Sequence, residues 1–224
     1  MRYLFLLLFI ALNIQLQAQI GFNAKVVGND AEKWTLSSLA NLEGRDNQLL
    51  NDGYSFGVDY WIRLESTRID FLPEFNYSNF STTILPDEIE LNSTFYSFLV
   101  NANIYFLNLE GDCTCPTFYQ EGPSLQKGLF LNVSPGLHYF EGKLSDAENE
   151  LRSNDLTFSI GGGIGFDIGF SEFITVTPIA QIRYFPSVIW EGANEFINSI
   201  NEQVEDENTT LLQLSAGIRI GLLF

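Results

Sequence analysis

Apolar side chains occupy every second position over several long stretches of the chain. Every even-numbered residue is apolar from Tyr54 to Leu64 and again from Leu212 to Phe224. The stretch Leu156–Phe170 follows the same rule apart from Gly162, and its odd positions carry Thr, Ser, Asp and four glycines. A period of two predicts β-strands, because successive side chains of a strand point to opposite faces of the sheet.

Weaker forms of this pattern bring the number of predicted strands to eight. The additional segments are Ile20–Gly28, Ile69–Phe80, Phe95–Leu107, Leu129–Tyr139 and Ile174–Phe185. Several strands exceed the roughly five or six residues usual in soluble sheets and match the roughly 9–11 residues of a tilted membrane crossing. Pro73, Pro135 and Pro178 fall inside the strands. Since proline donates no backbone hydrogen bond, we expect each to mark a bulge or a strand end.

The two faces of the predicted strands differ in composition. All charged residues within the strands fall on the polar face: Lys25, Asp59, Arg63, Asp70, Glu74, Asp167, Arg183 and Arg219. Four basic side chains exposed to lipid would cost about 2–4 kcal/mol each near the middle of a bilayer. In a membrane barrel the polar face therefore points inward, and matched charges are predicted to fill the lumen. The Gly161-x-Gly163-x-Gly165 run fits a narrow lumen in which small residues make room for large ones.

Two short links between strands suggest how the strands pair. The predicted pairs are Arg63 with Asp70, Asp59 with Glu74, Gly161 with Arg183, and Gly163 with Gln181. Asp59 and Glu74 then carry like charges within about 5 Å of each other, which requires a cation nearby. We expect Lys25 to bridge the two carboxylates, because the first predicted strand is the other neighbour of the second.

Residues 1–18 are predicted to be a cleaved secretory signal peptide. A basic start at Arg2 is followed by the apolar run Tyr3–Leu12 and by the small residue Ala18 at the expected cleavage point. The run is well short of the roughly 20 apolar residues that a membrane-spanning helix needs. The remaining segment, 19–224, is predicted to form one barrel domain exported to an oxidising compartment.

The chain is acidic, and the acidity lies mainly between the strands. Its 224 residues include 28 acidic and 11 basic ones, so the formal charge is −17, which argues against a nucleic-acid partner. With both termini in the periplasm, four segments become the outer loops and together hold 19 acidic and 4 basic residues. These predicted loops are Asn29–Gly53, Ser81–Thr94, Phe140–Asp155 and Pro186–Asn208.

The pattern resembles the small eight-stranded outer-membrane β-barrels of the OmpA/OmpX type, and among them the PorT-like barrel proteins. The resemblance covers about residues 20–224, and its most specific part is the final strand, Leu211–Phe224. This final strand, which ends on Phe224, is similar to the C-terminal signal that the outer-membrane assembly machinery recognises. The resemblance implies an all-β, eight-stranded antiparallel up-and-down transmembrane barrel in the cell outer membrane, inserted into lipid by that machinery. It implies no particular activity, so we expect a structural or interaction role with an unknown protein partner.

Few side chains offer catalytic or metal chemistry. Cys113 and Cys115 are interpreted as a local disulfide or as two structural cysteines, the alternative being a redox-active or metal-holding pair. His138 is expected near the outer end of the fifth strand, and Ser134 shares its face at roughly 13 Å, too far to hydrogen-bond. We therefore expect no enzyme and assign no catalytic, cofactor-binding or metal-binding residue.

The last outer loop holds two further features. Within Ala193–Asp206, four apolar residues have helical spacing and are expected to pack on the barrel rim, the alternative being a helix that binds a partner. The run Glu205-Asp206-Glu207 is interpreted as solvated charge, the alternative being a site for divalent cations that bridge surface lipid. Two other protein classes stay open: a soluble lipocalin-like barrel that binds an apolar ligand, and a lipid-modifying enzyme at the rim that depends on His138.

Overall fold

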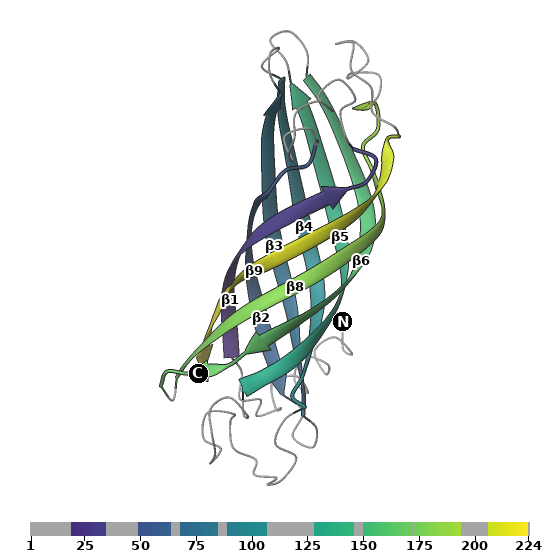
Figure 1. Ribbon diagram of the computed structural model, residues 1–224. Coiled ribbons are helices and arrows are strands. Elements are labelled where there is room, and N and C mark those ends of the chain that lie inside the picture. Colours follow the sequence, from purple (N-terminus) through teal and green to yellow (C-terminus); the bar gives the residue numbers. More distant parts are fainter. Residues whose placement is uncertain are drawn as a thin grey trace, which may run out of the picture.

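The computed structural model describes residues 19–34, 49–63, 68–84, 89–106, 128–145, 150–171, 173–193 and 206–223. Within these ranges it contains nine strands (Figure 1). They are β1 (Gln19–Ala31), β2 (Gly53–Arg63), β3 (Ile69–Ile84), β4 (Ile89–Ile104), β5 (Leu129–Ser145), β6 (Glu150–Phe166), β7 (Ile168–Gly169), β8 (Ile174–Ile189) and β9 (Asn208–Leu223). No helix in the described ranges is long and apolar enough to span a membrane.

The strands form one closed antiparallel barrel. Each strand from β1 to β5 pairs with the next in the chain, as do β7 with β8 and β8 with β9. The pairs β1–β9 and β6–β8 complete the circle. β6 and β7 pair with β8 in one continuous register, from Gly165 opposite Ile179 to Ile168 opposite Val176. They are therefore a single strand interrupted at Asp167. The predicted eight-stranded up-and-down barrel is confirmed.

The predicted pairing of the two short hairpins is also confirmed. Asp59 lies opposite Glu74 and Arg63 opposite Asp70 in the β2–β3 pair. Gly161 lies opposite Arg183 and Gly163 opposite Gln181 in the β6–β8 pair. The register was predictable because a slip by one residue would turn every charged side chain of these strands toward the outside.

The three prolines do not mark bulges or strand ends, so that prediction is wrong. Pro73, Pro135 and Pro178 are paired inside β3, β5 and β8 without a shift of register. The pairs next to Pro73 and Pro135 are missing on one side only, toward β2 and β4 respectively. Proline lacks a single donor, and a barrel strand has two neighbours, so the ladder weakens on one side and continues on the other.

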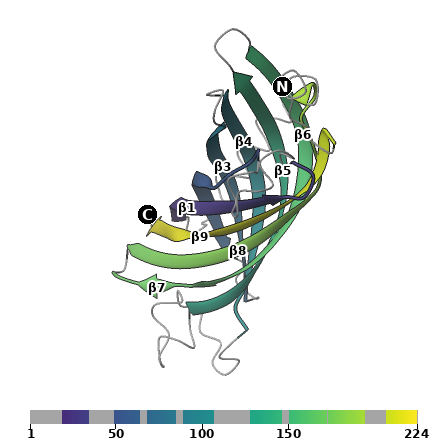
Figure 2. The same ribbon diagram turned by 45° about the horizontal axis from the view of Figure 1, so that its top comes forward.

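The strands extend further than the apolar alternation predicted, and the loops between them are correspondingly shorter. The segments Ser81–Thr94 and Phe140–Asp155, expected as loops, instead belong mostly to paired strands. Pairing reaches Ile84 opposite Ile89 in the first segment and Ser145 opposite Glu150 in the second. Side chains outside a membrane need not be apolar, whereas backbone pairing continues regardless. β3, β4, β5 and β6 form the tallest part of the wall (Figure 2). We call the end of the barrel at which these four strands project the loop end. The opposite end, where β1 begins and β9 finishes, is the terminal end.

The outer surface of the barrel is apolar. Large apolar side chains are exposed on every strand, among them Phe22, Phe56, Phe75, Phe98, Leu137, Phe158, Ile168, Ile182 and Ile218. Toward the loop end this belt is bordered by exposed tyrosines, which are Tyr54, Tyr77, Tyr96, Tyr139 and Tyr184. Tyr96 lies 5.6 Å from Tyr77 and 6.3 Å from Tyr139, measured between ring centroids. A girdle of aromatic rings at the edge of an apolar band is typical of barrels that cross a membrane.

Candidate functional site

The inside of the barrel is polar, the reverse of a soluble barrel. Buried polar side chains line it on every strand from β1 to β6 and on β8 and β9, and they include Lys25, Asp59, Asp70, Glu74, Arg183 and Arg219. The prediction that the polar face points into the lumen is confirmed for these residues. Asp167 also lines the lumen, whereas the side chain of Arg63 lies outside the described ones.

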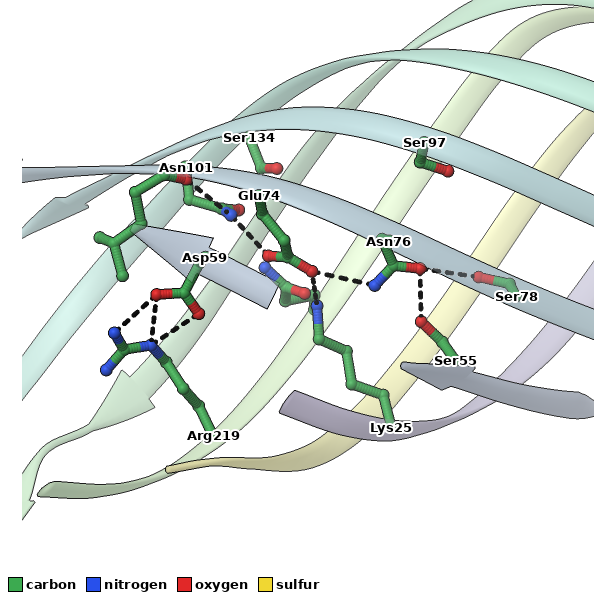
Figure 3. Close-up of polar contacts among 12 residues, drawn as sticks. Lys25, Ser55, Asp59, Glu74, Asn76, Ser78, Ser97, Asn101, Ser134 and Arg219 are labelled. Atoms are coloured by element: carbon green, nitrogen blue, oxygen red, sulfur yellow. Dashed lines mark hydrogen bonds and ion pairs between the residues drawn. The ribbon is translucent and has the colours of Figure 1, made fainter. Parts of the chain in front are cut away.

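One buried ion pair joins two strands that are not neighbours in the barrel. Arg219 of β9 donates to both carboxylate oxygens of Asp59 on β2, with nitrogen–oxygen distances of 2.6–3.0 Å (Figure 3). The Arg219 Nη1 also donates to the Gln19 side chain at 3.3 Å. The intervening strand contributes Gly21, and a Cβ built there would lie 2.4–2.5 Å from Asp59 and Arg219. The absence of a side chain at Gly21 therefore lets Arg219 reach across β1.

Lys25 holds Glu74, and it does so without bridging Glu74 to Asp59. The Lys25 Nζ lies 3.2 Å from Glu74 Oε1, and both side chains are buried. Asn76 donates to the same oxygen at 2.9 Å, and Asn101 donates to Oε2 at 2.7 Å (Figure 3). Sequence reasoning thus chose the right basic residue for Glu74 and missed Arg219 as the partner of Asp59. Two separate ion pairs satisfy the like charges that the hairpin places side by side.

His138 lies deep in the wall and not at the rim. Its side chain is buried, and its two ring nitrogens lie 2.7 Å from Ser97 Oγ and 2.6 Å from Ser159 Oγ. Arg183 donates to Ser159 Oγ and to Ser134 Oγ, both at 2.7 Å. The predicted place near a strand end is wrong, because β5 continues to Ser145 beyond the end of its apolar alternation. Arg183 therefore links Ser134 and Ser159, and Ser159 also contacts His138. These four side chains form one hydrogen-bonded layer, which we call the His138 layer.

The loop end of the lumen is closed by packed aromatic rings, which we call the mouth cluster. It consists of Trp34, Phe80, Phe95, Phe140, Phe185 and Trp190, all at most 2% exposed. The Trp34 ring lies 5.5 Å from Trp190 and 5.8 Å from Phe140, measured between centroids. Trp34 Nε1 and the Trp190 backbone amide both donate to the carbonyl oxygen of Glu207. This bonding ties the segments after β1 and β8 to the start of β9.

A bend in β8 carries Trp190 into the mouth. The β8–β9 register shifts between Phe185 and Val188. Beyond that point the Ile189 amide donates to Asp155 and the Glu191 amide to Ser153, both at 2.9 Å. Side chains of β6 thus replace the backbone pairing between β6 and β8, which stops at Tyr184, and they hold the end of β8 against β6.

Several sequence candidates fall outside the described residues. These are the signal peptide at 1–18, Cys113 and Cys115, most of the Ala193–Asp206 segment, Glu205 of the acidic run, and Phe224. In the described ranges, no three His, Cys, Asp or Glu side chains gather into a group that could hold a metal ion. Sequence reasoning also missed the mouth cluster. Its signal was present, since Phe95, Phe140 and Phe185 are large aromatic residues on the face of their strands that also carries the buried polar residues.

Comparisons with known proteins find similarity in structure alone. No protein-family model matches the sequence, and no curated protein matches it. Neisserial surface protein A has a TM-score of 0.47 at 11% identity, covering 93% of this chain and 97% of its own. Ail, the attachment invasion locus protein of Yersinia pestis, has a TM-score of 0.47 at 10% identity, covering 92% and 99%. The outer membrane protease OmpT of Escherichia coli has a TM-score of 0.42 at 7% identity, covering 93% and 94%.

The described residues define the class of the protein. Its outside is an apolar belt with a tyrosine border, its inside is polar and ion-paired, and its sheet has no open side at the level of that belt. A surface of this kind is stable in lipid, and closure satisfies the backbone hydrogen bonds that lipid cannot. The chain is a small eight-stranded β-barrel of the outer-membrane type. The finer PorT-like assignment stays a prediction.

Proposed function

We propose that the protein is a closed barrel of the outer membrane with a structural or interaction role on the outer side of that membrane. The single observation that carries this proposal is the filled lumen. Two ion pairs, the His138 layer and the mouth cluster follow one another from the terminal end to the loop end. Among the described residues, this filling leaves no continuous path for a solute. We therefore assign the function to contacts made by the outer part of the barrel.

The part available for contact is the tall wall at the loop end. Above the tyrosine border the outward side chains of β3–β6 become polar, and they bond to one another across the strands. Asn79 donates to Asn92 at 2.8 Å, and Lys143 lies 3.1 Å from Glu150. We propose that this polar wall and the acidic segments joined to it face outward, with the terminal end in the periplasm. The proposed partner is a protein that binds this wall.

The lipocalin alternative is contradicted by the distribution of side chains. A soluble barrel that binds an apolar ligand needs an apolar interior, whereas here the interior is polar and the exterior apolar. The hypothesis of a lipid-modifying enzyme at the rim depends on His138. This residue is buried inside the barrel, where it contacts Ser97 and Ser159, so it does not lie at the rim.

Fractionation tests the location. We expect the full chain to be recovered with outer membranes and to require detergent for solubility, because its apolar belt is exposed on all sides. We also expect the unheated protein to run faster on a gel than the boiled protein, since a closed barrel stays compact in detergent. Recovery in the soluble fraction without detergent would contradict an integral membrane barrel.

Conductance tests the closed lumen. Purified protein inserted into a planar lipid bilayer should show no stable single-channel openings, because the mouth cluster and the polar layers fill the path. An open porin inserted under the same conditions serves as the positive control. Steady ohmic openings of the purified protein would contradict the closed barrel and favour a transport role.

A further inference from the structure

Two rows of polar side chains lie just above the tyrosine border on the outer face of the tall wall. Tyr77, Tyr96 and Tyr139 stand opposite one another across β3, β4 and β5. Two residues nearer the loop end, the first row contains Asn79, Thr94, Glu141 and Asn154. Another two residues on, the second row contains Ser81, Asn92, Lys143 and Arg152. The belt that lies in lipid therefore continues directly into polar side chains.

The height of each row above the border determines which part of a lipid it meets. Outward side chains of one strand are about 7 Å apart along the strand. A strand tilt of about 45° reduces this to about 5 Å of height, so the second row lies about 10 Å above the tyrosines. The headgroup layer of a phospholipid leaflet is about 5–7 Å thick. The second row thus lies above phospholipid headgroups, at a height that the sugars of a glycolipid reach.

Amide and hydroxyl groups of the two rows are held in place by hydrogen bonds. Asn79 Nδ2 donates to Asn92 Oδ1 at 2.8 Å and to Thr94 Oγ1 at 3.2 Å. Among the hydrogen bonds of the described residues, none uses Asn79 Oδ1 or Asn92 Nδ2. One acceptor and one donor are therefore available side by side on an exposed surface. Sugar hydroxyls, which both donate and accept, match such a pair.

Basic side chains gather in the second row although the outer end is acidic. The predicted outer segments hold 19 acidic and 4 basic residues, and two of the four, Lys143 and Arg152, lie opposite each other across β5 and β6. Both contact Glu150, and their side chains are 39% and 65% exposed. Together with Glu141 the four charges sum to zero, so an anionic headgroup meets less repulsion here. Exposed ion pairs are weak, so both basic groups can turn to an acidic sugar or a phosphate.

We propose that this surface binds the headgroup of one anionic glycolipid of the outer leaflet. We call it the headgroup strip, and it consists of Asn79, Asn92, Thr94, Lys143, Arg152 and Asn154. Its amides and hydroxyl bind sugar hydroxyls, its two basic side chains bind acidic groups of the sugars, and the acyl chains lie against the belt below. Because the strip continues the lipid-facing belt, its ligand is a lipid and not a soluble sugar. The inference rests on the proposed outward orientation of the loop end, and it leaves the wall beyond Glu150 to the partner protein.

Native mass spectrometry of the full chain in a neutral detergent tests the strip. The barrel is mixed with lipopolysaccharide cut back to lipid A and its inner acidic sugars, with lipid A alone, or with phosphatidylglycerol. We expect one molecule of the sugar-bearing lipid to stay bound at a concentration at which phosphatidylglycerol is lost. Lipid A alone should bind more weakly, because it lacks the sugars that reach the second row. Equal retention of the three lipids would show that the apolar belt alone holds them, and would overturn the proposal.

Two matched lysines locate the site. Lys143→Gln and Arg152→Gln should each weaken binding of the sugar-bearing lipid about fivefold, as expected for one basic side chain near an anionic lipid surface. Lys33→Gln is the control, since Lys33 is 38% exposed and ion-paired to Asp206 but lies outside the strip. It should bind the lipid as the wild-type protein does. Equal losses in Lys33→Gln and Lys143→Gln would mean that net charge attracts the lipid, and would overturn the site.

Labelling of intact cells separates this inference from the proposed function. Glu90 is exposed on β4 just beyond the strip. Glu90→Cys should react with a membrane-impermeant maleimide, with the unsubstituted chain as the control. Labelling without retention of the sugar-bearing lipid would overturn the strip and leave the proposed orientation standing. A failure of Glu90→Cys to label would overturn the orientation, and the glycolipid site with it.

Discussion

Replacing Arg219 with Met should lower the free energy of unfolding by about 3–5 kcal/mol, because it leaves the Asp59 carboxylate buried without its partner. Asp59 is 4% exposed, and Arg219 supplies three of its hydrogen bonds. Met is close to Arg in length and keeps most of the packing. The loss therefore reports the unpaired charge, and urea unfolding of the barrel in detergent measures it.

A second substitution separates the two ion pairs. Adding Asp59→Asn to Arg219→Met should recover much of the loss, since the buried charge is removed. Adding Glu74→Gln to Arg219→Met should recover nothing, because Glu74 is paired with Lys25. The converse holds for Lys25→Met, which Glu74→Gln should rescue and Asp59→Asn should not. Equal rescue of Arg219→Met by Asp59→Asn and Glu74→Gln would show that the four charges act as one cluster, against the separate pairs seen in the structure.

The sequence was enough to predict where the buried charges lie, but not how all of them pair. Period-two alternation determined which residues face inward, and two short hairpins determined which residues lie opposite each other, so Asp59 beside Glu74 was predictable. The partner of Asp59 was not, because it depends on how far a side chain reaches across a strand. Arg219 crosses β1 where Gly21 leaves space, and neither alternation nor spacing records that gap.

The length of the strands was underestimated for a related reason. Apolar alternation reports contact with lipid and stops at the membrane surface, while backbone pairing continues, as in β5 up to Ser145. This error also misplaced His138. The mouth cluster escaped prediction because Trp34 and Trp190 come from segments after strands β1 and β8, where no periodic pattern applies. Only the inward phenylalanines of the wall, such as Phe95 and Phe140, indicated an apolar layer there.

The glycine run of β6 gives a second prediction of large effect, in which two adjacent positions respond in opposite ways. Gly163 points into the lumen, and a Cβ built there would lie 2.5 Å from the Ala180 carbonyl oxygen, a backbone atom of β8. Gly162 points outward, and its nearest neighbouring atom would be 3.8 Å away. Neither residue has a positive φ, so alanine is compatible with the backbone at both positions.

Gly163→Ala should therefore destabilise the barrel by about 1–3 kcal/mol, because β8 must move to admit the methyl group. Gly162→Ala should be neutral or stabilise by about 0.4–1 kcal/mol, since it restricts the unfolded chain and makes only an ordinary van der Waals contact in the folded one. The two variants have the same composition, so urea unfolding midpoints in one detergent compare them directly. A loss at Gly162→Ala equal to that at Gly163→Ala would mean that strand flexibility at the run, and not lumen space, accounts for these glycines.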